Sequence, residues 1–398
     1  MDIYQESLQF HKEHKGKLAI RSKVRIKTKH DLSIVYTPGV AEVSKQIASH
    51  PDEAYDYTMK SNSVAVVTDG SAVLGLGDIG GYGVIPVMEG KCILFKEFAD
   101  IDAIPICFME KSHDLSDQIK NISPVFGGIN LEDIASPRCF EIEEELQDIG
   151  IPVMHDDQHG TAVVVLAGLI NACRVTGKRF SDLTVTLIGA GAAGYGITLL
   201  LKCLGTHDEY CDPVKEILVC DSKGIIHRKR GNLLENKYKY VIAHETNSEN
   251  RAGSIEDALK GSDVLIGVSA PNIVTTEMVK SMNPNPIVLA LANPIPEIMP
   301  EEAGAAGAAV VGTGRSDYPN QINNVLAFPG IFRGALDAAA TRITDEMKLA
   351  AAHSLADYVK RPRKDHILPN VLDKDVTWTV ARAVKQAALK CGCARIRK

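Results

Sequence analysis

Residues 183–201 constrain the fold of this chain more than any other segment. They contain no charged side chain and, at 19 residues, are about long enough to span a membrane. The segment opens with the β-rich run Leu183–Ile188, continues through a cluster of glycines and ends in an apolar helical run. This order is typical of a strand, a tight turn and a helix, and is unlike a continuous membrane helix. We therefore expect a folded α/β unit here and no membrane segment.

The glycine cluster has the pattern of a dinucleotide-binding turn. Its members are Gly189, Gly191, Ala192, Ala193 and Gly194. Glycines at these positions allow the backbone to approach a pyrophosphate, which binds at the N-terminus of the following helix. Glycine turns also recur for packing reasons, so the pattern alone is a weak signal. Its position between a strand and a helix favours a nicotinamide cofactor.

The next predicted strand ends at Asp221, whose carboxylate is a candidate partner of the cofactor ribose. The distance from Gly189 exceeds the usual spacing of about 20 residues, and Gly205–Pro213 is a plausible insertion. An acidic residue here favours NAD because it repels the 2′-phosphate of NADP. Arg228 and Arg230 follow Asp221 at a short distance in the sequence, so NADP remains an alternative cofactor.

Strands alternate with helical segments through the second half of the chain, which predicts a doubly wound parallel sheet. The strands are expected at residues 183–188, 216–220, 263–268, 287–291 and 308–312, and helices at 254–259 and 275–281. The chain length of 398 residues favours two domains. We predict an α/β substrate and metal domain over residues 1–160 and a Rossmann-like domain over 161–325. Helices at 334–360 and 376–389, within a C-terminal segment 326–398, are expected to pack back on the first domain.

Composition excludes some classes of partner. The net charge is −6 and the pI is near 6.1, so the chain has no basic field for nucleic acid. The nine cysteines lack metal-ligand spacing, which favours reduced thiols and a cytoplasmic location. Residues 1–17 mix charges of both signs and do not resemble a secretory signal.

Two acidic pairs lie upstream of the glycine cluster, namely Glu132-Asp133 and Asp156-Asp157. Carboxylate oxygens suit Mg²⁺ or Mn²⁺, and carboxylates beside an apolar helix are costly unless they are paired or bind a metal. The first pair precedes or opens the first turn of an amphipathic helix expected over 133–149, so it has a structural alternative as helix-end charge. His155 and His159 are less favoured ligands, because a site rich in oxygen donors suits a hard cation.

The glycine-rich loop Thr68–Gly83 is expected to serve a site, with a surface turn as the alternative. Apolar runs flank Glu89-Gly90-Lys91, which places Lys91 at or near a turn beside that loop. Lys91 and Tyr36 are candidate proton-transfer groups. Each needs burial or a nearby charge to bring its pKa into a useful range, and alone each would be an ordinary surface residue.

Several motifs together resemble malic enzyme, in the shorter bacterial-type form, over nearly the whole chain. These motifs are Tyr36-Thr-Pro-Gly-Val40, Thr68-Asp-Gly70, Leu74-Gly-Leu-Gly-Asp-Ile-Gly80, Asn130-Leu-Glu-Asp133, His155-Asp-Asp-Gln-His-Gly-Thr161, Leu291-Ala-Asn-Pro294, Ile322-Asn-Asn-Val325 and Phe328-Pro-Gly330.

The resemblance implies a role for particular residues of this chain. It implies that Glu132, Asp133 and Asp157 bind a metal ion, and that Lys91 and Tyr36 are catalytic. It also implies that Asn293 and Asn324 bind the substrate and that Asn293 contacts the cofactor as well. One position departs from the family. Longer members carry an arginine that binds a substrate carboxylate where this chain has Ala72. Lys96 or a residue of a second subunit is a candidate replacement.

The resemblance and the residue chemistry together imply oxidative decarboxylation of L-malate to pyruvate and CO₂ by a homodimer or larger assembly. Lys91 would accept the hydroxyl proton, the metal would stabilise the developing oxyanion, and Tyr36 would protonate C3. Two alternatives are a malolactic-type enzyme, which retains its cofactor and forms lactate, and a non-catalytic nucleotide sensor.

Overall fold

The computed structural model describes residues 2–73, 75–109, 114–205, 211–231 and 233–395. Leu74, which begins one of the quoted motifs, and residues 206–210 of the predicted insertion lie outside these ranges. The strands are β1 (Ser63–Thr68), β2 (Asp102–Cys107), β3 (Gly128–Leu131), β4 (Val153–His155), β5 (Thr184–Ile188), β6 (Glu216–Asp221), β7 (Gly224–Ile225), β8 (Val264–Gly267), β9 (Ile287–Ala290) and β10 (Val310–Thr313).

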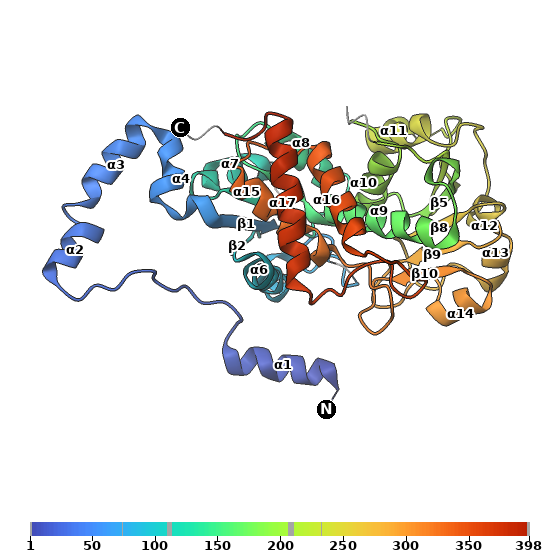
Figure 1. Cartoon of the computed structure of the whole chain (residues 1–398), viewed down its shortest axis with the longest axis horizontal. Coiled ribbons are helices and arrows are strands. Elements are labelled where there is room, and N and C mark those ends of the chain that lie inside the picture. The colour runs from blue at the N-terminus through green and yellow to red at the C-terminus, as the bar shows by residue number, and fades with distance from the viewer. Residues whose placement is uncertain (1, 74, 110–113, 206–210, 232, 396–398) are drawn as a thin grey trace.

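Helices surround both sheets (Figure 1). The α-helices are α1 (Ile3–His14), α2 (Lys29–Val35), α3 (Val40–Ser49), α4 (Ala54–Tyr57), α5 (Gly80–Gly83), α6 (Ile85–Ala99), α7 (Leu115–Ile122), α8 (Arg138–Leu146), α9 (Asp156–Thr176), α10 (Ala192–Leu201), α11 (Lys237–Glu245), α12 (Ile255–Leu259), α13 (Thr276–Lys280), α14 (Pro300–Ala305), α15 (Phe328–Asp337), α16 (Asp345–Tyr358) and α17 (Lys374–Lys390). Short 3₁₀ turns lie at Pro51–Glu53, Met59–Asn62, Ser123–Val125, Phe180–Asp182, Leu233–Glu235 and Asn324–Leu326.

The first sheet is parallel, with strand order β2-β1-β3-β4. Alternate residues of its central strand β1 serve opposite layers, because successive side chains of a strand point to opposite faces. Val64 and Val66 pack into the core that contains α6 and α15, whereas Ala65 and Val67 join the core formed with α7 and α8. Both faces are therefore covered, as expected for a parallel sheet.

The second sheet has the order β10-β9-β8-β5-β6-β7, and every strand pair except the short β6–β7 pair is parallel. The chain runs outward from β5 to β6 and then returns to β8 on the other side of β5. The strand order thus reverses at β5, and in such sheets ligands bind at this reversal, beyond the carboxyl ends of the strands. The α/β class and the doubly wound parallel sheet predicted from sequence are confirmed.

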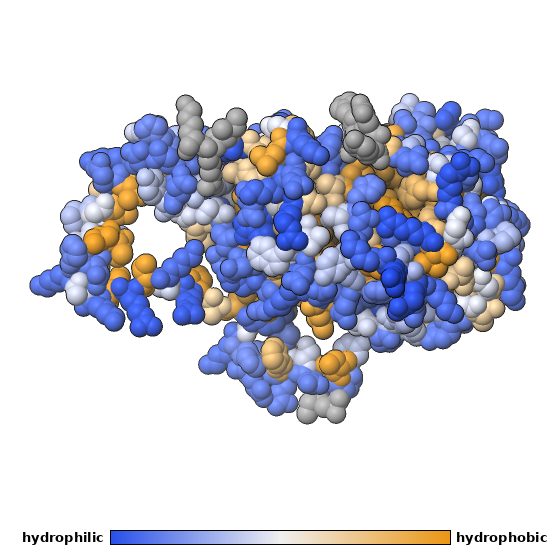
Figure 2. All heavy atoms as spheres, viewed as in Figure 1, coloured by the Kyte–Doolittle hydropathy of each residue, from blue (hydrophilic) through white to orange (hydrophobic). Residues whose placement is uncertain are grey.

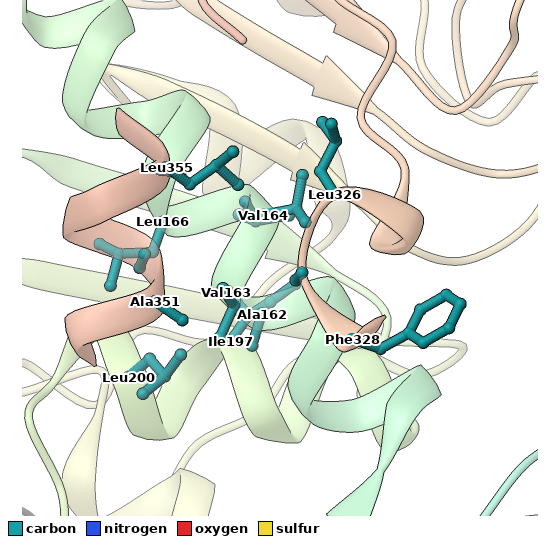
Figure 3. Close-up of a cluster of buried hydrophobic side chains, with 14 of the residues drawn as sticks. Ala162, Val163, Val164, Leu166, Ile197, Leu200, Leu326, Phe328, Ala351 and Leu355 are labelled. Carbon is teal, nitrogen blue, oxygen red and sulfur yellow. The ribbon is translucent and has the colours of Figure 1, made fainter. Parts of the chain in front are cut away.

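Helix α9 connects the two halves of the molecule. Our proposed domain boundary at residues 160/161 falls inside α9, so this helix belongs to both sides. Figure 3 shows Leu166 of α9 among Ile197 and Leu200 of α10 and Ala351 and Leu355 of α16. Among the described residues, α9 is the one helix long and apolar enough to cross a membrane, and 72% of that stretch is buried inside the protein. Its apolar surface therefore forms core, and residues 183–201 form β5 and α10 as predicted.

Three sequence predictions about local structure are wrong. The turn expected at Glu89-Gly90-Lys91 is the middle of the continuous helix α6, whose buried residues include Met88, Cys92 and Phe95. The single helix expected over 334–360 is two helices, α15 and α16, because the chain turns at Ala338–Thr344, where Ala339 has positive φ. The side chain of Thr344 then caps α16.

The third error concerns the cysteines. Cys203 and Cys211 form a disulfide, although all thiols were expected to be reduced. The remaining cysteines are free.

The C-terminal helices lie against the first half of the chain. Helices α15 and α17 both contact α6, and the rings of Phe328 and Phe332 in α15 meet Phe95 of α6 edge to face. The C-terminal segment therefore holds α6 against the first sheet.

Residues 18–50 extend away from this body and carry α2 and α3 (Figure 1); we call them the arm. No residue of the arm is buried. Apolar side chains are nevertheless frequent along it (Figure 2), and those of Ile20, Ile34 and Tyr36 are 101%, 59% and 67% exposed. An apolar segment with no packing partner in its own chain indicates an interaction surface.

The contact between α15 and α17 generates a stability prediction. A Cβ atom at Gly334 would lie 2.4 Å from the carbonyl oxygen of Ala381 and 2.7 Å from Cβ of Val384. We expect Gly334→Ala to lower the free energy of unfolding by about 1–3 kcal/mol through overpacking. Gly304→Ala is the matched control, since a Cβ in α14 meets no atom within 4 Å; it should stabilise by roughly 0.5–1 kcal/mol. Urea unfolding measures both, and equal effects would contradict the prediction.

Candidate active site

A cavity of about 670 Å³ lies where the carboxyl ends of the two sheets meet α6 and the start of α9 and α10. Its lining comes from sequence positions that span most of the chain. The sequence-predicted site residues that line it are Lys91, Glu132, Asp133, Asp157, Ala192, Ala193, Asn293 and Asn324. The loop after β1 also contributes, through Ala72, Val73 and Leu76. The loop therefore borders the candidate site, in agreement with the first of the two interpretations.

Lys91 is the centre of a buried ionic cluster. Its Nζ lies 2.6 Å from Oδ2 of Asp156 and 2.8 Å from Oε1 of Glu132, and it also faces the ring of Phe328. Burial lowers the pKa of Lys91, but the adjacent Asp156, Glu132 and Asp157 more than offset this and raise it above its ordinary value. Burial raises the pKa of Glu132 despite the nearby ammonium. The ammonium therefore keeps its proton in this arrangement.

Asp156 is the residue of this cluster to which the sequence analysis gave no role of its own. It is fully buried, accepts a hydrogen bond from Lys91, and accepts another from Nδ2 of Asn324 at 2.5 Å. Its other oxygen, Oδ1, has no hydrogen-bond partner among the described residues. The available signal was the general one, that a carboxylate beside an apolar helix needs a partner. In the sequence interpretation, this argument was applied to the neighbouring Asp157 instead.

The other acidic residues converge on the same cavity through backbone contacts. The backbone N–H of Asp133 donates to Oδ2 of Asp157 at 2.9 Å, and Asp133 itself has a φ of 52°. Oε2 of Glu132 accepts a hydrogen bond from Nδ2 of Asn130. The two acidic pairs that are separated in sequence are therefore neighbours in space. Among the described residues, however, no group of three His, Cys, Asp or Glu side chains has the spacing to hold a metal as it stands.

The two histidines of the second acidic motif have different surroundings. His159 Nε2 lies 3.0 Å from Oε2 of Glu143, and Oε1 of the same carboxylate accepts the backbone N–H of His155. Glu143 was predicted to be a solvated residue of an amphipathic helix, but it is buried. That helix, α8, begins only at Arg138, so Glu132 and Asp133 precede it. Burial raises the pKa of Glu143, but His159 and its other cationic neighbours lower it to about 2, so Glu143 is the charged partner.

The glycine turn has the close approaches that a dinucleotide-binding turn requires. Gly189 has a φ of 120°, and a Cβ there would lie 2.4 Å from the carbonyl oxygen of Val268. A Cβ at Gly194 would lie 1.9 Å from the carbonyl oxygen of Gly189. Gly191 is the N-cap of α10, whose first residues are Ala192 and Ala193. The backbone N–H groups at this helix start are available to an anion.

Asp221 lies at the end of β6, beside a second cavity of about 750 Å³. Both of its oxygens are engaged, since Arg230 donates to each, Lys239 donates to Oδ2 at 2.7 Å and the backbone N–H of Lys223 donates to Oδ1. Burial raises the pKa of Asp221, but these donors outweigh it and hold the pKa well below its ordinary value. A ribose hydroxyl that binds Asp221, as predicted, would therefore have to share this carboxylate with the donors of Arg230, Lys239 and Lys223.

Tyr36 is the predicted catalytic residue that this chain does not bring to the cavity. It is the C-cap of α2 on the arm, it is 67% exposed, and it is not among the residues that line the cavity.

Fold and site together define a nicotinamide-dependent oxidoreductase with a buried lysine–carboxylate cluster. Residues 14–118 match the family model described as the malic enzyme N-terminal domain, and residues 158–389 match the malic enzyme NAD-binding domain. The chain belongs to the malic enzyme family.

Individual relatives agree with this assignment. The chain is 52% identical to the bifunctional malic/malolactic enzyme of Bacillus subtilis, over 100% of this chain and 95% of that protein. It is 53% identical to the NAD-dependent malic enzyme of Geobacillus stearothermophilus, over 96% and 78% of the two chains. The crystal structure of malic enzyme from Pyrococcus horikoshii superposes with a TM-score of 0.94 at 46% identity, covering 100% of this chain and 93% of that one.

The glycine turn generates a binding prediction. Gly194→Ala should weaken binding of the nicotinamide nucleotide by at least about tenfold, because the added methyl group forces the start of α10 away from Gly189. Gly231→Ala is the control, since a Cβ there meets no atom within 4 Å. Isothermal titration calorimetry measures the affinities, and urea unfolding checks that both variants are folded. Unchanged nucleotide affinity in folded Gly194→Ala would contradict the role of the turn.

Proposed function

We propose that this chain catalyses the oxidative decarboxylation of L-malate to pyruvate and CO₂ with reduction of NAD or NADP. The observation that carries the proposal is the position of Lys91, which is buried between Asp156 and Glu132 in the cavity that the first turn of α10 also lines. A proton-transfer group thereby lies beside the helix end that suits a dinucleotide. The cytoplasm is the proposed location, because free thiols predominate among the cysteines.

We infer that Glu132, Asp133 and Asp157 hold Mg²⁺ or Mn²⁺. All three carboxylates line the cavity, and oxygen donors are the ligands that these ions prefer. Oε1 of Glu132 is held by Lys91, so the glutamate side chain has to turn away from the ammonium to complete the site. A bound divalent ion would supply Lewis acidity at the hydroxyl and carboxylate oxygens of the substrate.

Lys91 is the proposed acceptor of the proton on the malate hydroxyl, with Asp156 orienting its Nζ. Release of Glu132 to a metal would remove one of the charges that keep Lys91 protonated. Asn293 and Asn324 also line the cavity and are proposed to orient the substrate through their amide groups. Asn324 also donates to Asp156, which links substrate position to the lysine.

Tyr36 is the proposed proton donor to C3, and a second copy of the chain is proposed to supply it. In its own chain Tyr36 stands on the arm, outside the cavity. Exposed apolar residues such as Leu76 and Val87 line the cavity mouth, at 65% and 40% exposure, and suit the exposed apolar side chains of an arm. A homodimer that exchanges arms would cover both surfaces and complete two sites.

A malolactic activity is the second candidate, because one relative is named a bifunctional malic/malolactic enzyme. Such an enzyme returns the hydride to pyruvate, so it forms lactate without net reduction of the cofactor. A nucleotide sensor without catalysis is a third possibility, which would leave the buried lysine cluster without a role.

One assay separates these functions. Purified protein is mixed with L-malate and Mn²⁺, with NAD and NADP in separate reactions, and nicotinamide reduction, pyruvate and lactate are measured. We expect reduction stoichiometric with pyruvate that a chelator abolishes. Lactate without reduction would support the malolactic alternative, and neither product would support the sensor.

Two substitutions test the catalytic pair. Lys91→Ala should abolish malate oxidation, because the proton on the hydroxyl then has no acceptor. Tyr36→Phe should lower turnover by roughly 10²-fold or more, because general acid catalysis contributes on that scale. Undiminished turnover in either variant would remove that residue from its role.

A mixed dimer tests where Tyr36 acts. Lys91→Ala and Tyr36→Phe chains are co-expressed with different affinity tags, and the heterodimer is isolated. With exchanged arms, one of its two sites has both an intact lysine and an intact tyrosine, so about half of the wild-type activity should return. A heterodimer as inactive as its parents would place Tyr36 in its own subunit.

A further inference from the structure

In the part of the chain that the structure describes, the lining of the cavity offers no free lysine or arginine to a dicarboxylic acid. Among the described residues that line it, Lys91 is the one lysine or arginine, and it already contacts Asp156 and Glu132. Glu132, Asp133 and Asp157 add negative charge. On the proposed function, which this inference assumes, one malate carboxylate lies at the metal and the other enters this acidic cavity. Desolvating a carboxylate there without a cation is unfavourable.

An excess of positive charge lies where the chain leaves α1 and enters the arm. Residues 15–29 contain seven lysines and arginines and no acidic residue; these are Lys15, Lys17, Arg21, Lys23, Arg25, Lys27 and Lys29. Residues 18–28 form the connection between α1 and α2, and the apolar side chains of Ile20, Val24 and Ile26 are exposed along it. This segment therefore combines basic and exposed apolar side chains. It is complementary to the cavity, which has apolar residues at its mouth and carboxylates inside.

Arg25 is the arginine of this segment nearest to Tyr36. Helix α2 and the connecting residues 26–28 separate them; the seven residues of α2 span only about 10 Å, and the connection adds at most about 14 Å. Arg25 and Tyr36 thus lie on either side of α2, a few residues before it and directly after it, and both have long side chains that can reach toward one cavity. No acidic side chain contacts Arg25 in the described ranges of the chain, so its guanidinium is available.

We propose that Arg25 of a second copy binds the malate carboxylate that does not contact the metal. Its planar guanidinium can donate two parallel hydrogen bonds to a carboxylate, which a lysine cannot do. The arm would then deliver the proton donor and the carboxylate cation together, from one element. Malate would be recognised as a dicarboxylate only in the assembled site.

Kinetics of Arg25→Gln test the proposal. The KM for malate should rise roughly 10- to 100-fold, as expected when a charge-assisted pair is lost, with a smaller effect on kcat and none on the KM for the nucleotide. Arg25→Lys should recover part of the affinity. Arg21→Gln removes the same charge four residues further from Tyr36 and should leave the KM for malate within about twofold of wild type. An unchanged KM in Arg25→Gln would overturn the proposal.

A mixed dimer separates recognition from a structural role of Arg25. In a heterodimer of Arg25→Gln and Lys91→Ala chains, the site with an intact lysine receives its arm from the Lys91→Ala chain and therefore has a normal Arg25. We expect a wild-type KM for malate in this heterodimer. A KM that stays raised would overturn the proposal, because Arg25 would then act within its own subunit. Two controls are measured alongside. Turnover of the wild-type protein shows whether the proposed function holds, and the Lys91→Ala/Tyr36→Phe heterodimer shows whether arms are exchanged.

Discussion

The buried contact of Lys91 with Asp156 and Glu132 is the constraint on which the rest of the structure depends. It removes an ammonium and two carboxylates from water, and removal of the ammonium would leave two buried carboxylates without a compensating charge. The three residues come from α6, from the end of β3 and from the start of α9. These elements must therefore keep their relative positions. The packing of the C-terminal helices on α6 serves that requirement.

Helix α9 transmits the same constraint to the nucleotide side. Its first turn carries the two aspartates. Glu143 stabilises this turn, because its carboxylate accepts the backbone N–H of His155 and contacts the ring of His159. Further along, α9 packs closely on α10, since a Cβ at Gly196 would lie 2.5 Å from the carbonyl oxygen of Gln158. The acidic cluster and the glycine turn are thus both held by α9, which fixes the distance between them.

Features that depend on neighbouring residues were predictable from sequence, and features that depend on distant ones were not. The strand, turn and helix at 183–201 follow from local pattern. Gly90 made Lys91 look like a turn residue, but burial of Met88, Cys92 and Phe95 keeps α6 continuous. Nothing in the sequence distinguishes Asp156 from its neighbour Asp157. The contact of Asp156 with Lys91, 65 positions away, shows the difference. Glu143 lay within a run of glutamates that looked solvated, and only tertiary packing shows that it is buried.

Tyr36 shows a limit of a different kind. Motif resemblance assigns it to the site, yet a single folded chain leaves it in water on an arm without buried residues. The cores of the body contain no residue of the arm, and the arm has no core of its own. If the arm becomes ordered only on a second copy, folding of the body and completion of the site are separate events. Assembly would then control catalysis while nucleotide binding stays with the single chain.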